Sequence, residues 1–334
     1  MRIHQALLCS AILVLLISCT GQAFSNPAST TIPLRLGIQT TPIASIPIIA
    51  YSNGYFAEQG LAVDLQIFTA GTFALQTLLA GSLDVATPAE VPPTLALLQG
   101  NTGFVILAQG VQKTTNDIRV VVRDDGTATS PEEYFAAKKR KLATSFGGGP
   151  EFFTYNFLKL HNISAEHVEL ISQKPEDMPV ALASGSVDAI SIFEPYAYFA
   201  EQQTPNTKSF IDDGIYSELY VFAFSKNYLK NNPVAGEKFL RASIKAEEFI
   251  KNNPEQAKSI VSNFTKLDPK VLDAIWQRFD FAVVLTPKLA QYMQQEAVWA
   301  RETGKVPATA TLPPSETFID PTVLRSIKPE AVQI

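Results

Sequence analysis

Hydrophobic and polar positions in the first third of the chain follow a strand-and-helix order. Residues 34–38 alternate in polarity, and apolar stretches with helical spacing follow them. The pattern predicts strands over 34–38, 63–68 and 83–86 and helices over 46–56 and 71–80. Gly81 ends the second helix, because glycine enters the left-handed conformation beyond a helix end at little cost. Strands that alternate with helices at this spacing predict a parallel sheet with helices on its faces.

A short sequence within this pattern occurs twice, with an offset of 104 residues at its glycine. Residues 78–90 and 182–194 share a glycine, a serine, an aspartate and a glutamate at the same places. The matched pairs are Gly81/Gly185, Ser82/Ser186, Asp84/Asp188 and Glu90/Glu194. An internal repeat bears directly on the fold. A single pair this far apart predicts two similar lobes with a cleft between them.

The second copy repeats the order of the elements. It predicts strands over 141–144, 168–171 and 187–192, helices over 152–160 and 179–183, and a loop at 145–149. The offset is 106 residues at Leu36/Leu142 and 104 at the glycine, which two small loop deletions would explain. The repeat therefore extends over a whole βαβαβ half.

Two further predicted strands, 118–123 and 219–224, flank the second copy and make it an insertion with a two-stranded hinge. Residues 34–117 then form the first part of lobe 1, and residues 118–224 form lobe 2 with the hinge strands at its ends. Residues 225–334 return to pack on lobe 1 and are mostly helical. Helical spacing is seen at Leu289, Tyr292, Met293, Glu296 and Ala300.

The first residues predict export to the periplasmic or cell-surface face of a bacterial membrane. Arg2 precedes an apolar run from Ala6 to Ile17, which is short for a membrane span but suits a signal peptide over residues 1–18. The run ends on Leu16-Ile17-Ser18-Cys19, which resembles the bacterial lipobox, so we expect a lipid on Cys19 and a tether over 19–33. Ordinary signal cleavage after Ala23, with Cys19 incidental, is the alternative.

Composition and charge narrow the class of protein. The chain has 334 residues, 46% of them hydrophobic and 18% charged, as expected of a globular protein of about two domains. The net charge is −5, and removal of residues 1–18 takes away Arg2, so nucleic acid is not an expected partner. The basic cluster at 138–141 abuts a predicted strand and is expected to be a solvated edge. Cys9 leaves with the signal, so no free thiol is expected in the mature chain.

The sequence predicts no catalytic residue, cofactor or metal. His161 and His167 surround a predicted surface turn, with no partner at metal-ligand spacing. No G-x-S-x-G, H-E-x-x-H or P-loop motif occurs. The glycines at 147–149 follow a strand but lack the spacing of a dinucleotide-binding turn. Trp276 and Trp299 are predicted to lie in the core.

The candidate site consists of loops at the C-terminal ends of the predicted strands, because open α/β sheets bind ligands there. These loops are Gln39–Thr41, Thr69–Thr72 and Thr87–Glu90 in lobe 1, and Ser145–Gly149 and Phe193–Tyr196 in lobe 2. Several precede a helix, whose free N–H groups and positive end suit an anion. Alternatively, Thr41, Thr72 and Ser145 only cap helices.

Glu90 and Glu194 occupy equivalent places in the repeat and could face each other across a closed cleft. Glu194 precedes Pro195, and we favour the interpretation that it begins a helix. Glu90 lies in Ala89-Glu90-Val91-Pro92-Pro93. It is therefore the better candidate for a cationic or hydrogen-donating group of a ligand.

Several segments together resemble a known family. Gly54–Leu61, the helix–Gly–Ser–Leu–Asp segment, Ala89–Pro93 and Val187–Tyr196 are similar to the solute-binding proteins of ABC importers for nitrate, sulfonates, taurine and thiamine precursors. The resemblance extends over residues 33–330. It implies a type II periplasmic-binding-protein fold, in which two α/β lobes joined by two crossover strands close on a ligand.

The resemblance also implies a function. It implies a monomeric, lipid-anchored binding protein that captures a small organic solute and delivers it to a membrane permease and ATPase, and it implies no enzymatic activity. Enzymes of pyrimidine or menaquinone-precursor synthesis are the main alternative. The former carry a cysteine-rich motif that the mature chain lacks, and the latter are normally cytosolic. A ligand sensor without a transporter is the third alternative.

We expect the solute to be a sulfonate or taurine-like anion or a pyrimidine-like compound. Its anionic end would lie on backbone amides, its donor group on Glu90, and its body against aromatic side chains of lobe 2. The expected ligand-binding residues are Gln39, Thr40, Thr41, Gly71, Thr72, Glu90, Ser145, Phe146, Gly147, Gly148, Phe152, Glu194 and Tyr196.

Overall fold

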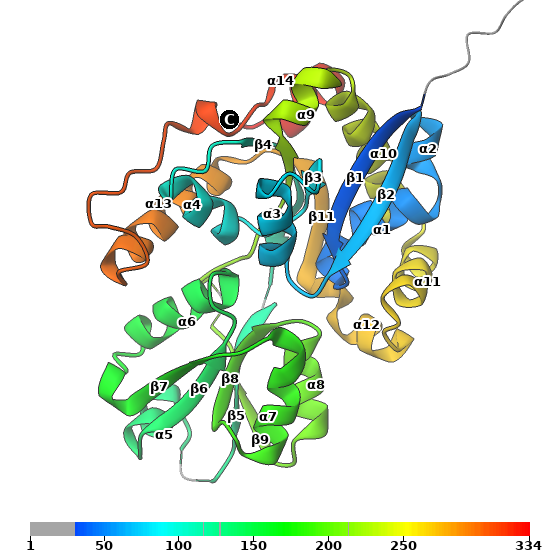
Figure 1. Ribbon diagram of the computed structural model, residues 1–334. Coiled ribbons are helices and arrows are strands. Elements are labelled where there is room, and N and C mark those ends of the chain that lie inside the picture. Colours follow the sequence, from blue (N-terminus) through cyan, green and yellow to red (C-terminus); the bar gives the residue numbers. More distant parts are fainter. Residues whose placement is uncertain (1–30, 116, 127, 213) are drawn as a thin grey trace, which may run out of the picture. The chain divides into compact units, whose positions relative to one another are not determined.

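The computed structural model describes residues 31–334 apart from Asn116, Thr127 and Asp213. The expected signal peptide, Cys19 and nearly all of the expected tether lie outside the described residues. Two sheets organise this part of the chain (Figure 1). We call the larger sheet with its helices lobe 1 and the smaller sheet with its helices lobe 2.

Lobe 1 is built on a six-stranded sheet with the order β11-β4-β10-β3-β1-β2. Its strands are β1 (Ile32–Gln39), β2 (Leu61–Phe68), β3 (Val85–Ala86), β4 (Phe104–Thr114), β10 (Tyr220–Ser225) and β11 (Phe279–Val284). β1 pairs in parallel with β2 and β3, whereas β10 is antiparallel to β3 and β4, and β11 is antiparallel to β4. The sequence predicts a parallel sheet, but the sheet is mixed, because strands from outside the repeat complete it.

Lobe 2 is built on a five-stranded sheet with the order β7-β6-β8-β5-β9. Its strands are β5 (Ile118–Arg123), β6 (Arg140–Thr144), β7 (Val168–Ser172), β8 (Ala189–Phe193) and β9 (Thr207–Phe210). β6 is parallel to β7 and β8, and β5 is antiparallel to β8 and β9. The order matches β2-β1-β3-β10-β4 of lobe 1, as a duplicated lobe requires.

The repeated residues perform the same structural tasks in both lobes. Gly81 and Gly185 follow a helix with φ of 81° and 76°, and the next N–H, of Ser82 or Ser186, returns to the carbonyl five residues before it at 3.0 Å. Asp84 accepts a hydrogen bond from the N–H of Arg35 at 2.8 Å, and Asp188 accepts one from the N–H of Lys141 at 2.9 Å. The repeated glycine and aspartate therefore end a helix and fix the strand after it.

Helices cover both sheets. Those associated with lobe 1 are α1 (Ser45–Ser52), α2 (Tyr55–Glu58), α3 (Gly71–Leu79), α4 (Val91–Leu98), α9 (Lys226–Asn231), α10 (Ala235–Asn252), α11 (Pro254–Thr265), α12 (Pro269–Ile275), α13 (Pro287–Glu302) and α14 (Thr322–Ile327). Those of lobe 2 are α5 (Pro131–Ala136), α6 (Gly149–Leu160), α7 (Met178–Ser184) and α8 (Tyr196–Gln203). The predicted helix over 46–56 is wrong in one respect: Gly54, at φ 74°, separates α1 from α2.

Two segments connect the lobes between β4 and β5 and between β9 and β10. The second predicted hinge strand is β10, and the structure places it inside the larger sheet, where all but its last residue are buried. The connecting segments are instead residues 115–117 and 211–219. The second segment is bonded to the last residue of β4, because Ser217 Oγ accepts from the Thr114 N–H at 2.8 Å and donates to the Thr114 carbonyl at 2.9 Å.

Helix α13 belongs to the cores of both lobes. Leu289 and Met293 lie in the core of lobe 1, while Trp299 and Ala300 lie in the core of lobe 2. Trp299 packs against Phe152 of α6 with their ring centroids 5.4 Å apart. Residues 225–334 thus pack largely on lobe 1, but the end of α13 reaches lobe 2. Trp276 and Trp299 are both buried, as predicted.

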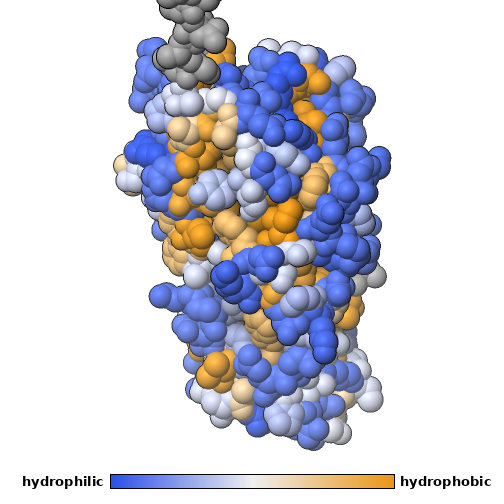
Figure 2. Space-filling view, turned by 90° about the vertical axis from the view of Figure 1, so that its right-hand side faces the viewer, coloured by the Kyte–Doolittle hydropathy of each residue, from blue (hydrophilic) through white to orange (hydrophobic). Residues whose placement is uncertain are grey.

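The face of the molecule seen in Figure 2 is mostly polar. Figure 2 shows apolar side chains interspersed among hydrophilic ones over one face of the molecule. Within residues 31–334, no described helix is long and apolar enough to cross a bilayer. The basic cluster at 138–141 is only partly a solvated edge, because Arg140 is buried: its guanidinium pairs with Asp125 at 2.7 Å and lies 3.9 Å from the ring centre of Tyr134.

Candidate functional site

A small cavity lies between the two lobes. Residues of both lobes and of the second connecting segment line it: Gln39, Ala70, Gly71, Thr72, Ala89, Pro92, Ser145, Gly148, Gly149, Pro150, Phe193 and Glu218. The space open to the centre of a water molecule is about 20 Å³. This is room for about one water molecule. The lobes are therefore closely apposed here, and Thr72 Oγ1 lies 3.5 Å from the Gly147 carbonyl oxygen of the other lobe.

Two helices begin at this cavity, one from each lobe. Neither α3, which follows Ala70, nor α6, which follows Gly148, has a side-chain cap. Gln39 Oε1 accepts from the Gly71 N–H at 2.9 Å, and Glu151 Oε2 accepts from the Gly147 N–H at 2.7 Å. Uncapped helix starts present N–H donors and a partial positive charge. The cavity can therefore receive a hydrogen-bond acceptor or an anionic group from both lobes.

Glu218 supplies the ionisable side chain in the cavity lining. It is 4% exposed, and its pKa lies well above the usual range of a glutamate because burial disfavours the charged form and Asp117 and Glu90 lie close. Gly149 lies directly opposite: an added Cβ would overlap Glu218 Oε1 and would lie 3.0 Å from the Tyr216 hydroxyl. The absence of a side chain at Gly149 allows α6 to approach the connecting segment closely.

Glu90 lies behind Glu218 and outside the cavity lining. Its Oε2 accepts from the N–H of Leu219 at 2.9 Å, so it holds the second connecting segment against α4. Tyr216 and Glu296 of α13 interact with the same carboxyl, and Glu296 Oε2 accepts from Thr94 Oγ1 at 2.5 Å. Burial raises the pKa of Glu90 to about 7. Among the described residues, Glu90 Oε1, Glu296 Oε1 and the Tyr216 hydroxyl have no hydrogen-bond partner of good geometry.

Glu194 takes part in a buried ion-pair network that joins lobe 2 to Arg278 of lobe 1. Arg119, 1% exposed, donates to Glu194 and, at 2.9 Å, to Glu201, and Arg278 Nε lies 3.1 Å from Glu194 Oε1. Glu194 Oε2 also accepts from the N–H of Tyr198 at 3.0 Å, in the first turn of α8. The position of Glu194 agrees with the interpretation that it begins a helix. The two glutamates of the repeat are both buried and do not face each other across the cavity.

The structure brings together only part of the expected ligand-binding set. Those that line the cavity are Gln39, Gly71, Thr72, Ser145 and Gly148. Those outside its lining are Thr40, Thr41, Glu90, Phe146, Gly147, Phe152, Glu194 and Tyr196. Phe146 borders a different hollow, near Lys305, and Phe152 packs edge-on against Tyr216 at 5.3 Å. Phe193 is the aromatic residue of the lining.

The capping alternative does not describe the three hydroxyl residues. Thr41 precedes a short 3-10 turn but makes no side-chain cap, and its Oγ1 is buried without a partner among the described residues. Thr72 lies inside α3, after the N-cap residue Ala70. Ser145 lies three residues before Gly148, the N-cap residue of α6. Thr72 and Ser145 therefore line the cavity without capping a helix.

The sequence interpretation missed Glu218 and Asp117. Asp117 immediately precedes β5 (Ile118–Arg123). Glu218 precedes β10 (Tyr220–Ser225), with Leu219 between them. The two carboxyl groups hydrogen-bond to each other, and burial raises the pKa of Asp117 to about 7. Both residues could have been identified from the sequence, because each is an acidic residue next to an almost wholly apolar strand. Such a strand is buried, and the residue that precedes it is buried with it.

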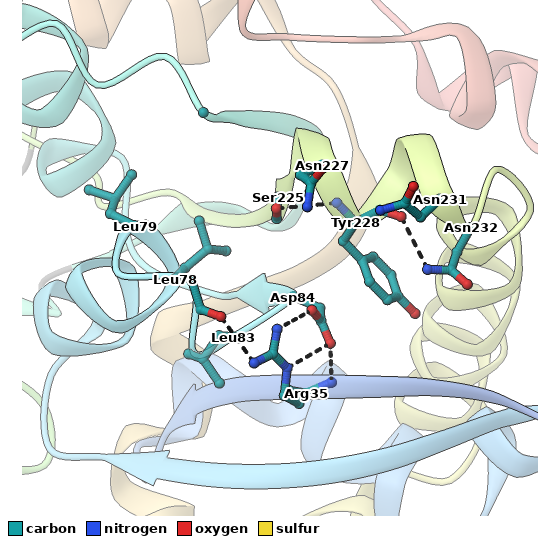
Figure 3. A pocket seen from close by; sticks show the side chains of 12 residues that line it. Arg35, Leu78, Leu79, Leu83, Asp84, Ser225, Asn227, Tyr228, Asn231 and Asn232 are labelled. Atoms are coloured by element: carbon teal, nitrogen blue, oxygen red, sulfur yellow. Dashed lines mark hydrogen bonds and ion pairs between the residues drawn. The ribbon is translucent and has the colours of Figure 1, made fainter.

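A larger hollow of about 390 Å³ lies in lobe 1, at the other ends of β1 and β3 (Figure 3). Figure 3 shows its charged residues engaged with each other: Arg35 Nη2 and Asp84 Oδ1 are 2.7 Å apart, and Arg35 Nε also bonds Asp84 at 3.1 Å. This pair fixes β1 to β3, and lobe 2 has the corresponding bond at Asp188. The charged residues of this hollow therefore have a structural role in holding the strands of lobe 1 together.

No described residues form a group that could hold a metal ion. His161 is less exposed than a surface turn would leave it. Its ring nitrogens lie 2.5 Å from Glu132 Oε1 and 2.7 Å from Asp212 Oδ2, so it joins the end of α6 to α5 and to the second connecting segment.

The buried carboxyls predict a pH dependence of stability. Glu90 and Asp117 have a pKa of about 7 in the folded protein, above the 4.5 and 3.8 of free side chains. The folded state therefore binds more protons between about pH 4.5 and 7, and the free energy of unfolding falls as pH rises through this range. Glu90→Gln removes one of these groups and should flatten the decline, at about 1.4 kcal/mol for each unit of pKa difference.

Urea unfolding at pH 5, 6, 7 and 8 measures this decline. Glu237→Gln, an exposed position on α10, serves as the matched control and should keep the slope of the parent protein. Equal slopes for Glu90→Gln and the parent protein would show that Glu90 does not titrate in this range.

The solved structures that are similar share the two-lobed arrangement. The periplasmic aliphatic sulphonate-binding protein SsuA from Escherichia coli has a TM-score of 0.70 at 20% identity, covering 83% of this chain and 94% of that chain. The periplasmic nitrate-binding protein NrtA from Synechocystis PCC 6803 has a TM-score of 0.74 at 17% identity, covering 89% of this chain and 88% of that chain. The fold is that of a periplasmic binding protein.

The chain belongs to the NMT1-like family, whose model matches residues 28–264. A Bacillus subtilis protein named as the binding protein YtlA is 26% identical over 244 residues, covering 69% of this chain and 70% of that protein. A second B. subtilis protein, named for binding aliphatic sulfonates, is 25% identical and covers 79% of each chain. A formylaminopyrimidine-binding protein of Halalkalibacterium halodurans is 24% identical and covers 75% of each chain.

Proposed function

We propose that this chain is an exported, lipid-anchored binding protein that captures a small organic solute between its lobes and presents it to the permease and ATPase of an ABC importer. The observation that carries the proposal is the cavity where two uncapped helix starts, one from each lobe, meet Glu218. The cavity as it stands has room for about one water molecule, so a solute would enter with the lobes further apart and would then contact both lobes and the segment between them. Its binding energy therefore favours the closed arrangement over the open one.

The proposed binding residues follow from this cavity. Backbone N–H groups of Thr72, Gly148 and Gly149 would take the anionic or acceptor end of the solute, because the Gly71 N–H is already bonded to Gln39. Glu218 would take a donor group. Phe193 would lie against its body, and Glu90 would act by holding the connecting segment in place. A taurine-like sulfonate or a pyrimidine-like compound meets these requirements, and relatives of the chain carry names of both kinds.

A thermal-shift screen against sulfonates, nitrate, pyrimidines and amines tests the proposal with the chain from residue 20 onward. One solute class should raise the melting temperature in a concentration-dependent way. A ligand at a hundredfold excess over its Kd stabilises a protein by about 2.7 kcal/mol. The absence of a shift for every class at millimolar concentration would overturn the proposed function.

The lipid anchor is tested separately in cells. Cys19→Ser should move the protein from the membrane fraction to the soluble fraction, because the thiol is the proposed attachment point. Cys9→Ser is the matched control, since Cys9 lies within the expected signal peptide, and it should leave the protein with the membranes. Membrane retention of the Cys19→Ser protein would contradict lipidation at this residue.

A further inference from the structure

The ionisable side chain that lines the inter-lobe cavity is acidic. Of the described residues that line it, none is a lysine, an arginine or a histidine, and Glu218 is acidic. Glu218 reaches the cavity from the connecting segment and lies against Gly149 at the start of α6. A solute in the cavity therefore contacts a carboxyl group, with no basic side chain of the lining to offset it.

More carboxyl groups lie directly behind Glu218. Asp117 of the first connecting segment hydrogen-bonds to it, and Glu90 at the start of α4 and Glu296 of α13 lie within electrostatic reach. Tyr216 and Tyr220 are the tyrosines that interact with it. The two guanidinium groups of the region, Arg119 and Arg278, act on Asp117 and Glu194. The group nearest the cavity is therefore acidic, with more carboxyls than guanidiniums behind it.

Three buried side chains behind Glu218 form a connected group. Tyr216 and Glu296 both interact with the carboxyl of Glu90. The Tyr216 hydroxyl lies next to Gly149, which lines the cavity. A change of charge at Glu218 therefore acts on several carboxyl groups at once.

Building on the proposed function, we propose that the cleft selects a solute with a cationic nitrogen group, which lies against Glu218, and that binding releases a proton from the buried carboxyls to solvent. The uncapped starts of α3 and α6 remain for an acceptor or anionic end. A zwitterion therefore uses both halves of the site. A simple anion would leave the carboxyl group without a partner.

The proton release follows from electrostatics. Burial disfavours the charged form of Glu218, and the neighbouring carboxyls of Asp117 and Glu90 disfavour it further, so the pKa of Glu218 lies well above its usual range. A cation beside Glu218 stabilises its charged form, and the proton leaves to the buffer. An anion has the opposite effect and takes up a proton. The direction of proton transfer thus reports the charge of the solute group that lies beside Glu218.

Matched pairs of small molecules test the inference even while the natural solute is unidentified. The pairs are taurine with ethanesulfonate, β-alanine with propionate, and 5-aminomethylpyrimidine with 5-methylpyrimidine. Each pair differs by one amine. In the pair that binds, the amine-bearing member should bind at least about tenfold more tightly, since one charge-assisted hydrogen bond gives about this factor.

Isothermal titration calorimetry in phosphate and in Tris at pH 7 measures the protons exchanged, because the two buffers differ in their ionisation enthalpy. We expect proton release for the amine-bearing member and a rise in its affinity from pH 6 to pH 8. Glu218→Gln should reduce both the preference for the amine and the number of protons released. Glu237→Gln, exposed on α10, should change neither. If Glu218→Gln fails to fold, the comparison within each pair decides the question in the parent protein.

Two outcomes overturn the inference and leave the proposed function intact. One is binding of the amine-free member as tightly as its partner, with proton uptake. The other is binding in the cleft of a solute that carries no cationic nitrogen, while all three pairs fail to bind. Failure of every solute class in the thermal-shift screen overturns the proposed function itself and is therefore distinguishable from both.

Discussion

Arg119→Ala should lower the free energy of unfolding by about 3–5 kcal/mol, the usual cost of removing one partner of a buried ion pair. Arg119 is 1% exposed and holds two carboxylates, the equally buried Glu194 and the partly exposed Glu201. Without the guanidinium, Glu194 keeps Arg278 and the Tyr198 N–H, but the charge of Arg119 is lost from the interior. The loss falls between β5, β8 and α8 and should unfold lobe 2 first.

Chemical denaturation followed by circular dichroism measures this effect. Arg241→Ala is the matched control, because Arg241 forms an exposed pair with Glu237 one helical turn away on α10. Pairs of this kind contribute about 0.3–0.5 kcal/mol. Similar losses for the two variants would contradict the structural role given to Arg119.

Gly149→Ala should weaken solute binding by about ten- to a hundredfold. The added methyl group would overlap Glu218 Oε1 and lie 3.0 Å from the Tyr216 hydroxyl. Overpacking of this kind costs about 1–3 kcal/mol, and each 1.4 kcal/mol is a factor of ten in affinity. Glu218 cannot move away freely, because Asp117 and Glu90 surround its carboxyl group.

A glycine away from the cavity provides the control. Gly103→Ala adds a Cβ with no heavy atom within 4 Å, and Gly103 does not line the cavity, so the variant should bind the solute as well as the parent protein. Neither glycine has a positive φ, so both accept alanine without backbone strain. Equal affinities for the two variants would place the solute away from the contact between α6 and Glu218.

The repeat explains why much of the fold was predictable from the sequence. Gly81 and Gly185 each end a helix, and Asp84 and Asp188 each fix the following strand, so a short repeated spacing carries the geometry of an entire lobe. The flanking strands then indicated an inserted lobe. Periodicity and glycine chemistry act locally, and local rules are readable from sequence.

The candidate site was only partly predictable, because side chains from distant segments build it. The loops at Gly71–Thr72 and Gly148 were expected, since they precede helices in both copies. Glu218 enters through the second connecting segment, whose path depends on β10 lying inside the larger sheet. Glu90 was expected at the solute, but its bond to Leu219 turns it toward the connecting segment. The equivalent places of Glu90 and Glu194 did not predict their different partners.

Hydrogen–deuterium exchange with the solute from the thermal-shift screen tests the central claim most directly. If the solute binds between the lobes, exchange should slow together in three segments: residues 71–76 of α3, 148–153 of α6, and 216–220 with Glu218. The hollow around Arg35 in Figure 3 provides an internal comparison. Protection of residues 81–84 and 225–232 around that hollow, with no change in the three cleft segments, would contradict the account.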